Sequence, residues 1–194
     1  MEATLSKRDK IMEAALVLFA ERGYDGTTVP MIADKAEVGT GTIYRYFENK
    51  EALVNALFQD CVQGLHDTVK RDYPEAGGVR EQFRHVFFAM VRFAKANIHG
   101  FYFVDTHSNA RYLDPESRES FRQLMDFLHA YAAAGIQQGI IRPLQADVLI
   151  AIVFGAFAKV FSLIRAGKLS ETPQMLGQLE ESCWDAVSVH GKNV

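Results

Sequence analysis

The sequence predicts an all-α fold of about nine helices, and two observations support that prediction. Apolar residues recur three and four positions apart along almost the whole chain, which is the spacing of one face of a helix. Alternating strand-like runs and Asn-Gly hairpin signals are missing. With 194 residues and 48% hydrophobic content, the chain can bury a sizeable core, and we expect a folded, soluble protein.

The first part of the chain predicts three helices in close succession. A capping-box sequence at Ser6 starts the first helix, and Gly23 ends it. Thr28 caps a second, short helix of sequence VPMIADKA, whose proline stands in the first turn, where a missing N–H costs nothing. After a tight connection we expect a third short helix through residues 40–46.

The rest of the chain predicts a longer helix and then a larger helical portion. The longer helix starts near Asn49 and runs to about Asp72, and the turn formers of residues 74–78, Pro-Glu-Ala-Gly-Gly, follow it. We therefore expect two domains, residues 1–50 and 51–194, with residues 49–72 as the connecting helix. The further helices are expected around Phe83 to Ala94 and at about 101–109, 115–138, 145–166 and 173–189.

Three short helices closed by a fourth are typical of a helix-turn-helix, whose second member lies in the DNA major groove. The small residues Gly39–Thr42 open the third helix and allow a close approach to a phosphate or to base edges. Ile43 and Phe47 are four residues apart and would face the core, which leaves Tyr44–Tyr46 on the outward side. The pattern therefore predicts a DNA-contacting surface on this helix.

Each polar residue type here suits a DNA contact. Arg45 can pair with guanine O6 and N7, tyrosine hydroxyls can hold phosphates, and Lys50 at the next helix start can neutralise another phosphate. The alternative is structural: Gly39–Thr42 is then a helix-capping loop, and both tyrosines are half-buried packing residues.

The segment TTVPMIADKAEVGTGTIYRYFENKEAL, residues 27–53, resembles the tetracycline-repressor (TetR) family of bacterial regulators. The preceding helix, IMEAALVLFAERGYDGTT, agrees as well, so the resemblance covers about residues 8–57 at motif level. The remainder agrees in length and all-helical layout. The resemblance implies a dimeric transcription factor, usually a repressor, that binds a palindromic operator. It implies DNA contacts for eight residues: Thr28, Thr40, Gly41, Thr42, Tyr44, Arg45, Tyr46 and Lys50.

Two residues depart from the pattern of the family. Glu37 occupies a turn position that is usually glycine, and a left-handed conformation there costs a non-glycine residue ~1 kcal/mol. We therefore expect a slightly different turn. Gly39 stands where serine or threonine is common, which removes one side-chain phosphate contact.

The phenylalanines predict where a sensor site lies. Eleven of the fourteen fall between residues 83 and 161, and the resemblance implies a small-molecule pocket among the middle helices of the back domain. His99, Asp105 and Asn109 are polar candidates that could orient an apolar effector. The alternative is that these rings form only the core of a helical bundle and that the histidines are surface or core residues. The predicted effector site consists of Phe87, Val91, Phe103, His107, Phe121, Met125 and Phe154.

The run that starts at Val148 is apolar on all sides for eleven residues before Lys159, which we interpret as too short and too interrupted to span a bilayer. A helix of this kind gains burial by packing against its own domain on one side and a second copy on the other. The resemblance implies that the last two helices form a four-helix homodimer interface. The predicted interface residues are Ala151, Gly155, Ala158, Leu176, Leu179, Cys183 and Val187.

Charge and composition limit the partners. A net charge of −3 argues against a protein that coats nucleic acid by positive potential, so any contact with double-stranded DNA must be local. We see no signal peptide or membrane segment and expect a cytoplasmic protein. The histidines and cysteines lack metal-ligand spacing, and we expect no metal and no cofactor.

Three classes of function remain at this stage. The leading hypothesis is a ligand-responsive DNA-binding regulator released by a small hydrophobic or aromatic-containing effector. The first alternative is a redox-responsive regulator that uses Cys61. The second is a helical enzyme, although no nucleophile with its base, carboxylate pair, phosphate-binding loop or metal set is recognisable in the sequence.

Overall fold

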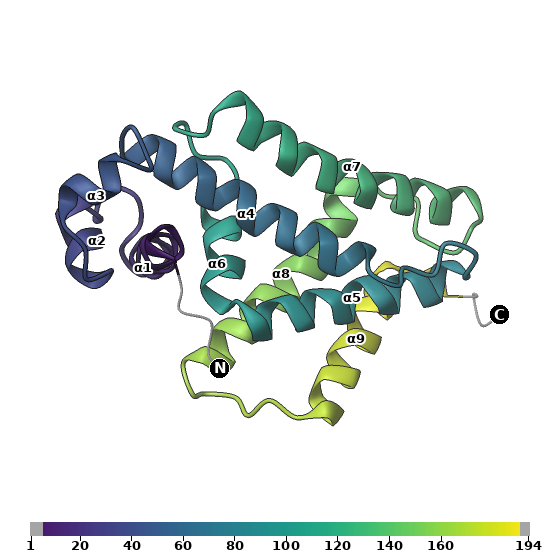
Figure 1. The fold of residues 1–194 in the computed structure, drawn as a ribbon. Coiled ribbons are helices and arrows are strands. Elements are labelled where there is room, and N and C mark those ends of the chain that lie inside the picture. The colour runs from purple at the N-terminus through teal and green to yellow at the C-terminus, as the bar shows by residue number, and fades with distance from the viewer. Residues whose placement is uncertain (1–5, 191–194) are drawn as a thin grey trace. The chain divides into compact units, whose positions relative to one another are not determined.

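The computed structural model describes residues 6–190, which fold into nine α-helices and form no β-strand beyond a single bridge between Ile141 and Ser188 (Figure 1). The predicted all-α fold is confirmed. In chain order the helices are α1 (Lys7–Arg22), α2 (Val29–Lys35), α3 (Thr40–Tyr44), α4 (Lys50–Lys70), α5 (Val79–Ala96), α6 (Ile98–His107), α7 (Pro115–Gln137), α8 (Ala146–Arg165) and α9 (Pro173–Val187).

Local capping signals set the starts of the first helices. Ser6 and Asp9 form the predicted capping box, with the Asp9 amide donating to Ser6 Oγ at 3.2 Å. Thr28 Oγ1 accepts the amide of the third residue after it at 3.5 Å, and Asn49 Oδ1 does the same at 2.8 Å. These side chains satisfy amides that have no partner inside the helix.

Several helix boundaries differ from the prediction by two residues or more, and two of the differences bear on the site. α6 begins at Ile98 rather than near residue 101, because Asn97 caps it: Asn97 Oδ1 accepts the Gly100 amide at 2.8 Å. One residue therefore separates α5 from α6. α3 ends at Tyr44 rather than at residue 46, so the helix offered to DNA is a single turn and a half.

The chain forms two compact units, and they do not follow chain order. The first unit contains the residues up to Arg71 together with Ala89–Gln123, and the second contains Asp72–Phe88 and the residues from Leu124 onward. α6 thus belongs to the same unit as α1–α4, which include the predicted DNA-binding helices.

The core of the first unit forms where α6 packs against α1 and α4. Phe103 of α6 is fully buried, and its ring lies 6.1 Å from Phe19 of α1 and 6.3 Å from Phe58 of α4, centroid to centroid. Burying rings of this size supplies much of the free energy that holds α6 on these helices.

The core of the second unit joins the start of α5 to α8 and α9. Phe87 of α5 meets Phe157 of α8 edge to face at 5.5 Å, and Phe83 lies 5.2 Å from Trp184 of α9. α8 and α9 also pack against each other, after the extended connection visible in Figure 1.

The core of the second unit also contains a buried ion pair. Glu180 of α9 has no exposed surface, and both of its oxygens accept from Arg80 of α5 in a bidentate pair, one of the two bonds at 2.9 Å. The Arg80 guanidinium also lies 5.1 Å from the Trp184 ring. The hydrogen bond to Glu180 is the main cause that raises the pKa of Arg80. This pair fixes α9 against α5, since a carboxylate buried without its partner is strongly unfavourable.

We predict that Arg80→Ala lowers the free energy of unfolding by roughly 2–4 kcal/mol. The cost stays below that of a fully buried pair because 38% of the Arg80 side chain is exposed. Arg84→Ala is the matched control, since its guanidinium lies 3.6 Å from the same carboxylate but is 58% exposed, and we expect it to cost less than about 1 kcal/mol. Urea unfolding of both variants measures the difference. Equal losses of unfolding free energy would show that the bidentate contact contributes no more than the single contact of Arg84.

Candidate nucleic-acid interface and sensor region

α3 is held by two buried side chains at its inner face. Ile43 is 1% exposed and Phe47, just beyond the helix, is 6% exposed. The amides of Tyr46 and Phe47 both donate to the Ile43 carbonyl at 2.9 Å, which continues the turn after the last helical residue. α2 packs against both α1 and α3 and so supports the short helix (Figure 1). Its other side carries the predicted DNA contacts.

The outward side of α3 matches the prediction in its exposure. Tyr44 is 53% exposed and Tyr46 is 47% exposed, and Arg45 between them is exposed. Among residues 6–190 the Arg45 side chain makes no hydrogen bond and no ion pair. An exposed guanidinium with its donors unused is suited to bind a base edge or a phosphate.

The other predicted contacts lie near the helix starts. Thr28 is exposed and caps α2, so its hydroxyl already accepts one amide. At the start of α3, Gly41 is exposed and Thr40 and Thr42 are half-buried. The Thr42 amide is used inside the turn, where it donates to the Gly39 carbonyl at 2.8 Å.

Lys50 is placed differently from its neighbours. Its Nζ donates to the carbonyls of Tyr24 and Thr27 at 3.0 and 3.1 Å and lies 3.8 Å from the centre of the Tyr24 ring. The ammonium therefore joins the start of α4 to the connection between α1 and α2. Two of its three N–H groups are used within the chain, a role that sequence reasoning missed because the partners are 23 and 26 residues away.

The turn between α2 and α3 keeps the left-handed geometry. Glu37 has φ of 55°, its amide donates to the Asp34 carbonyl at 3.2 Å, and the Val38 amide donates to the Ala33 carbonyl at 3.0 Å. These two bonds form a Schellman motif, which ends a helix with one left-handed residue. The expectation of a different turn is therefore wrong: the two hydrogen bonds hold the conformation although a non-glycine residue occupies it.

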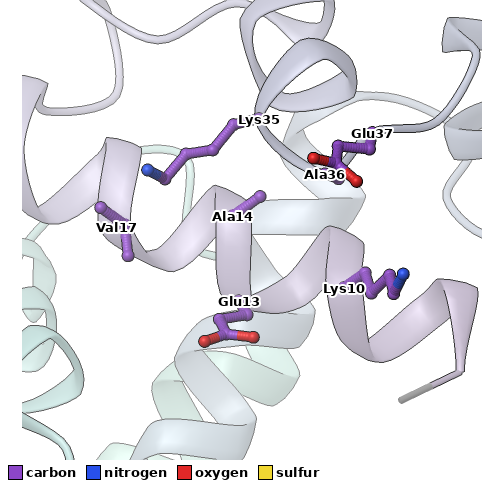
Figure 2. Close-up of a pocket in the computed structure, with 7 residues that line it drawn as sticks. All are labelled: Lys10, Glu13, Ala14, Val17, Lys35, Ala36 and Glu37. Carbon is purple, nitrogen blue, oxygen red and sulfur yellow. The ribbon is translucent and has the colours of Figure 1, made fainter. Parts of the chain in front are cut away.

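An open groove of about 370 Å³ lies beside this turn (Figure 2). The small side chains of Ala14 and Ala36 leave room between α1 and the end of α2. Two lysines and two glutamates surround it, so its charges cancel and favour neither an anion nor a cation. None of the predicted effector-site residues lines it. The lining residues are Lys10, Glu13, Ala14, Val17, Lys35, Ala36 and Glu37.

The residues predicted to bind an effector are divided between the two units. Val91, Phe103, His107 and Phe121 belong to the first, and Phe87, Met125 and Phe154 belong to the second. In the first unit Phe121 is half-buried and its ring lies 6.0 Å from that of Phe58. Of the polar candidates, Asp105 and Asn109 are exposed, whereas His99 Nδ1 is buried and has no hydrogen-bond partner among the described residues.

His107 is a buried, neutral histidine. It is 4% exposed, and its Nδ1 lies 2.9 Å from the Phe103 carbonyl, which requires the proton on that nitrogen. Burial lowers the pKa of His107, and the hydrogen bond to Phe103 opposes that shift only in part. Its ring lies 4.3 Å from that of Phe103, so it is part of the α6 core.

α8 is apolar over most of its surface, yet only Leu149, Phe157 and Phe161 of this helix are buried. By length and composition it is apolar enough to cross a membrane, which corrects the expectation that the run is too short. Val148 is 43% exposed and Ile152 is 36% exposed in the single chain. This face has no cover within the described residues.

The predicted interface residues fall into two groups. Ala151 and Gly155 of α8 are exposed, and Ala158 and Leu179 are half-buried. The remaining three, all on α9, are buried inside the single chain: Leu176, Cys183 and Val187, at 6%, 3% and 3% exposure. Side chains that are already buried offer almost no surface to a partner.

Both cysteines are buried, and burial disfavours their reactive thiolate form. Cys61 is 4% exposed, and burial raises the pKa of its thiol to about 12. Burial also raises the pKa of Cys183 to about 11. Because the thiolate is the reactive form, both thiols are inert at neutral pH, which weakens the redox alternative.

A short exposed helix after a tight turn, supported by packed helices, is typical of a helix-turn-helix DNA-binding protein. Residues 11–57 match the model of bacterial regulatory proteins of the tetR family, and residues 58–189 match the tetracyclin repressor-like C-terminal domain. The chain therefore belongs to the TetR family. It is a DNA-binding transcription regulator and not an enzyme, since this family consists of regulators.

Relatives agree with this assignment. The fatty acid metabolism regulator protein of Bacillus subtilis is 29% identical over 73% of this chain and 74% of its own length. The transcriptional repressor KstR2 of Mycobacterium tuberculosis is 26% identical over 71% of this chain and 70% of its own. A TetR-family regulator from Marinobacter aquaeolei VT8, 23% identical, has the same fold with a TM-score of 0.83 over 95% of this chain and 96% of that one.

We predict that Glu37→Gly stabilises the protein by about 1 kcal/mol, because glycine adopts a φ of 55° without the clash that a Cβ causes. The melting temperature should rise by about 2–4 °C. Glu37→Ala is the matched control: it removes the charge but keeps the Cβ, so it should not stabilise. If alanine raises the melting temperature as much as glycine does, the effect comes from the charge and not from the backbone.

Proposed function

We propose that the protein is a repressor that binds a palindromic operator as a homodimer and is released by a small apolar effector. Residues 1–50 bind DNA in this proposal, and residues 51–194 sense the effector and dimerise, with 49–72 as the connecting helix. The observation that carries it is the outward side of α3, where the exposed Arg45 has no partner among residues 6–190. DNA is its target, which is consistent with a place in the cytoplasm.

On DNA, Arg45 reads a base edge in the major groove, and the tyrosines beside it contact the backbone. Thr28, Thr40, Gly41 and Thr42 lie at the starts of α2 and α3, where they support phosphate contacts. Lys50 has one N–H left for a phosphate after its two bonds to carbonyls, so its larger contribution is to hold the domain together.

The dimer proposal rests on the exposed apolar face of α8. Val148, Ile152 and Gly155 follow one another at helical spacing, and Ile140 and Leu144 extend the exposed apolar residues toward α7. A second copy of the same face would cover them around a twofold axis. Since the α9 residues Leu176, Cys183 and Val187 are already buried, α8 supplies most of this interface, with Leu179 beside it.

The effector proposal is supported by aromatic content and by one relative. The sensor region buries Phe87 and Phe103 almost completely, and few polar side chains lie among its rings. The relative from Bacillus subtilis is named as a regulator of fatty acid metabolism. Both observations favour an apolar compound, and fatty acids are the first to test. The connecting helix α4 then carries the change to α3.

We predict that Arg45→Ala loses ~1–3 kcal/mol of discrimination between its operator and random DNA. Arg45→Lys is the matched control, because it keeps the positive charge and loses the bidentate geometry, so it should lose discrimination but keep affinity for random DNA. The operator is first selected from a pool of random duplexes, and titrations over a range of salt concentrations then give both affinities. Equal losses on operator and random DNA for the alanine variant would argue against base readout.

We predict that Gly155→Glu weakens dimerisation at least about 100-fold, because it buries an unpaired charge. A Cβ added at Gly155 meets nothing within 4 Å in the single chain, so the monomer should fold normally. Ala96→Glu adds the same charge at the exposed end of α5 and is the control. Sedimentation measures the association. A stable monomer of the unmodified protein at micromolar concentration would refute the dimer.

We predict that the effector lowers operator affinity 5- to 150-fold, a coupling of ~1–3 kcal/mol, and that operator DNA lowers effector affinity by the same factor. Calorimetry with saturated fatty acids of increasing chain length, with and without saturating operator, measures both. A fatty acid whose affinity is unchanged by the operator is not the inducer. If Cys61→Ser abolishes an oxidant response, the redox alternative returns.

A further inference from the structure

The loop between α6 and α7, residues 108–114, contacts the connection between α1 and α2 and also contacts α4. In the first, the Tyr112 ring stacks on Tyr24, which lies in the connection between α1 and α2, with 4.1 Å between centroids and 22° between planes. In the second, Asn55 of α4 holds the loop backbone. All of these residues belong to the first compact unit.

Asn55 makes the loop position specific. It is 4% exposed, its Nδ2 donates to the Tyr112 carbonyl at 2.9 Å, and its Oδ1 accepts the Asp114 amide at 2.9 Å. If the loop moved away, Asn55 Oδ1 would lose its partner, and Nδ2 would keep only its bond to the Glu51 carbonyl at 2.9 Å. Leaving a buried amide oxygen without a partner is unfavourable. The loop therefore favours this docked position over intermediate ones.

Tyr24 connects the loop to the start of α4. Lys50 Nζ lies 3.8 Å from the centre of the Tyr24 ring and donates to the Tyr24 carbonyl. Lys50, Tyr24 and Tyr112 thus form a row of stacked groups from the first residue of α4 to the loop. Both the ring stack and the cation–π contact stabilise this arrangement.

The other ends of the loop are tied to α6 and α7. His107, the last residue of α6, is buried with its ring 6.1 Å from that of Tyr112, and its carbonyl accepts the Ala110 amide at 2.9 Å. Asp114 caps α7 through the Ser117 amide at 2.7 Å. A shift in α6 or in the first turn of α7 must therefore move Tyr112 or break these bonds.

We propose that Tyr112 and Asn55 are positioning residues for operator binding. When the loop is docked, they hold Tyr24 and the start of α4 in the arrangement that binds the operator, and the effector acts by undocking the loop. The inference rests on the proposed function, because it assigns the regulation of the same DNA-binding surface. It differs from a mechanism in which α4 alone carries the signal, since it requires the loop itself to respond to DNA.

The test uses the full chain and an operator selected from random duplexes, with hydrogen exchange as the readout. By reciprocity, a loop that controls operator binding must be stabilised when the operator binds. We expect exchange of the Asp114 amide, which donates to Asn55, to slow about 10-fold on adding operator to the wild-type protein. Tyr112→Phe keeps the ring and should behave like the wild type.

Tyr112→Leu removes the stack and should lose most of this protection, together with about 10-fold in operator affinity. Tyr24→Leu removes the same stack from the other side, so it can replace Tyr112→Leu if that variant folds poorly. The losses in operator affinity of the two variants should not be additive in the double variant. Phe93→Leu is the matched control: it removes a ring of the same unit that is 6% exposed and lies beside Gly64 of α4, and it should leave operator affinity within twofold of the wild type.

Three results would overturn the inference. Operator binding that leaves exchange in residues 108–114 unchanged shows that the loop is not coupled to DNA, although the proposed function stands. Equal losses of operator affinity for Tyr112→Leu and Phe93→Leu show a structural role only. If no duplex is selected at all, the proposed function itself fails before any variant is compared.

Discussion

The position of α3 depends on two buried side chains, because five residues cannot form a stable helix on their own. Ile43 and Phe47 anchor the helix to the rest of its unit, and the Schellman turn at Glu37 sets where it begins. Everything that the outward residues do on DNA depends on these anchors. That dependence explains why a left-handed glutamate is tolerated: the two hydrogen bonds of the turn and the burial of Ile43 together outweigh its backbone cost.

Because α3 has no stability of its own, its place is decided by the helices that support it. α2 packs against α1, α1 packs against α4, and α6 packs against both α1 and α4. Phe103 sits where these three helices meet and is fully buried between Phe19 and Phe58. Interiors packed in this way have discrete arrangements and transmit shifts without absorbing them. The membership of α6 in this unit is therefore the physical basis for the regulation we propose.

Features set by neighbouring residues could be predicted from the sequence. Ser6, Thr28 and Asn49 cap their helices as expected, since a cap needs only an oxygen near an amide three residues on. Asn97 carries the same signal, and it was missed because the apolar pattern on either side is continuous. In the candidate DNA-binding surface, Ile43 and Phe47 at helical spacing were enough to identify the inner face of α3.

Features set by distant partners could not be predicted. The stack of Tyr24 on Tyr112 and the pair of Arg80 with Glu180 join residues far apart in the chain, and no local pattern records either contact. The spacing of Leu176, Cys183 and Val187 correctly gave one apolar face of α9, but periodicity does not say which neighbour covers a face. Their burial inside the single chain settles that point for α9.

In α8 the apolar face is exposed rather than buried, and this exposure bears on how the protein reads DNA. Its apolar face from Val148 to Gly155 is uncovered by the rest of residues 6–190, although Phe157 and Phe161 of the same helix are buried. Exposed apolar surface of this kind favours association. In the proposed dimer, the α8 faces of two chains cover each other, and this brings two copies of α3 to the DNA. One copy alone reads too few base pairs for specificity. Folding stability and specificity for a twofold operator would then depend on the same helix, so that a chain unable to cover α8 would also be unable to select its site.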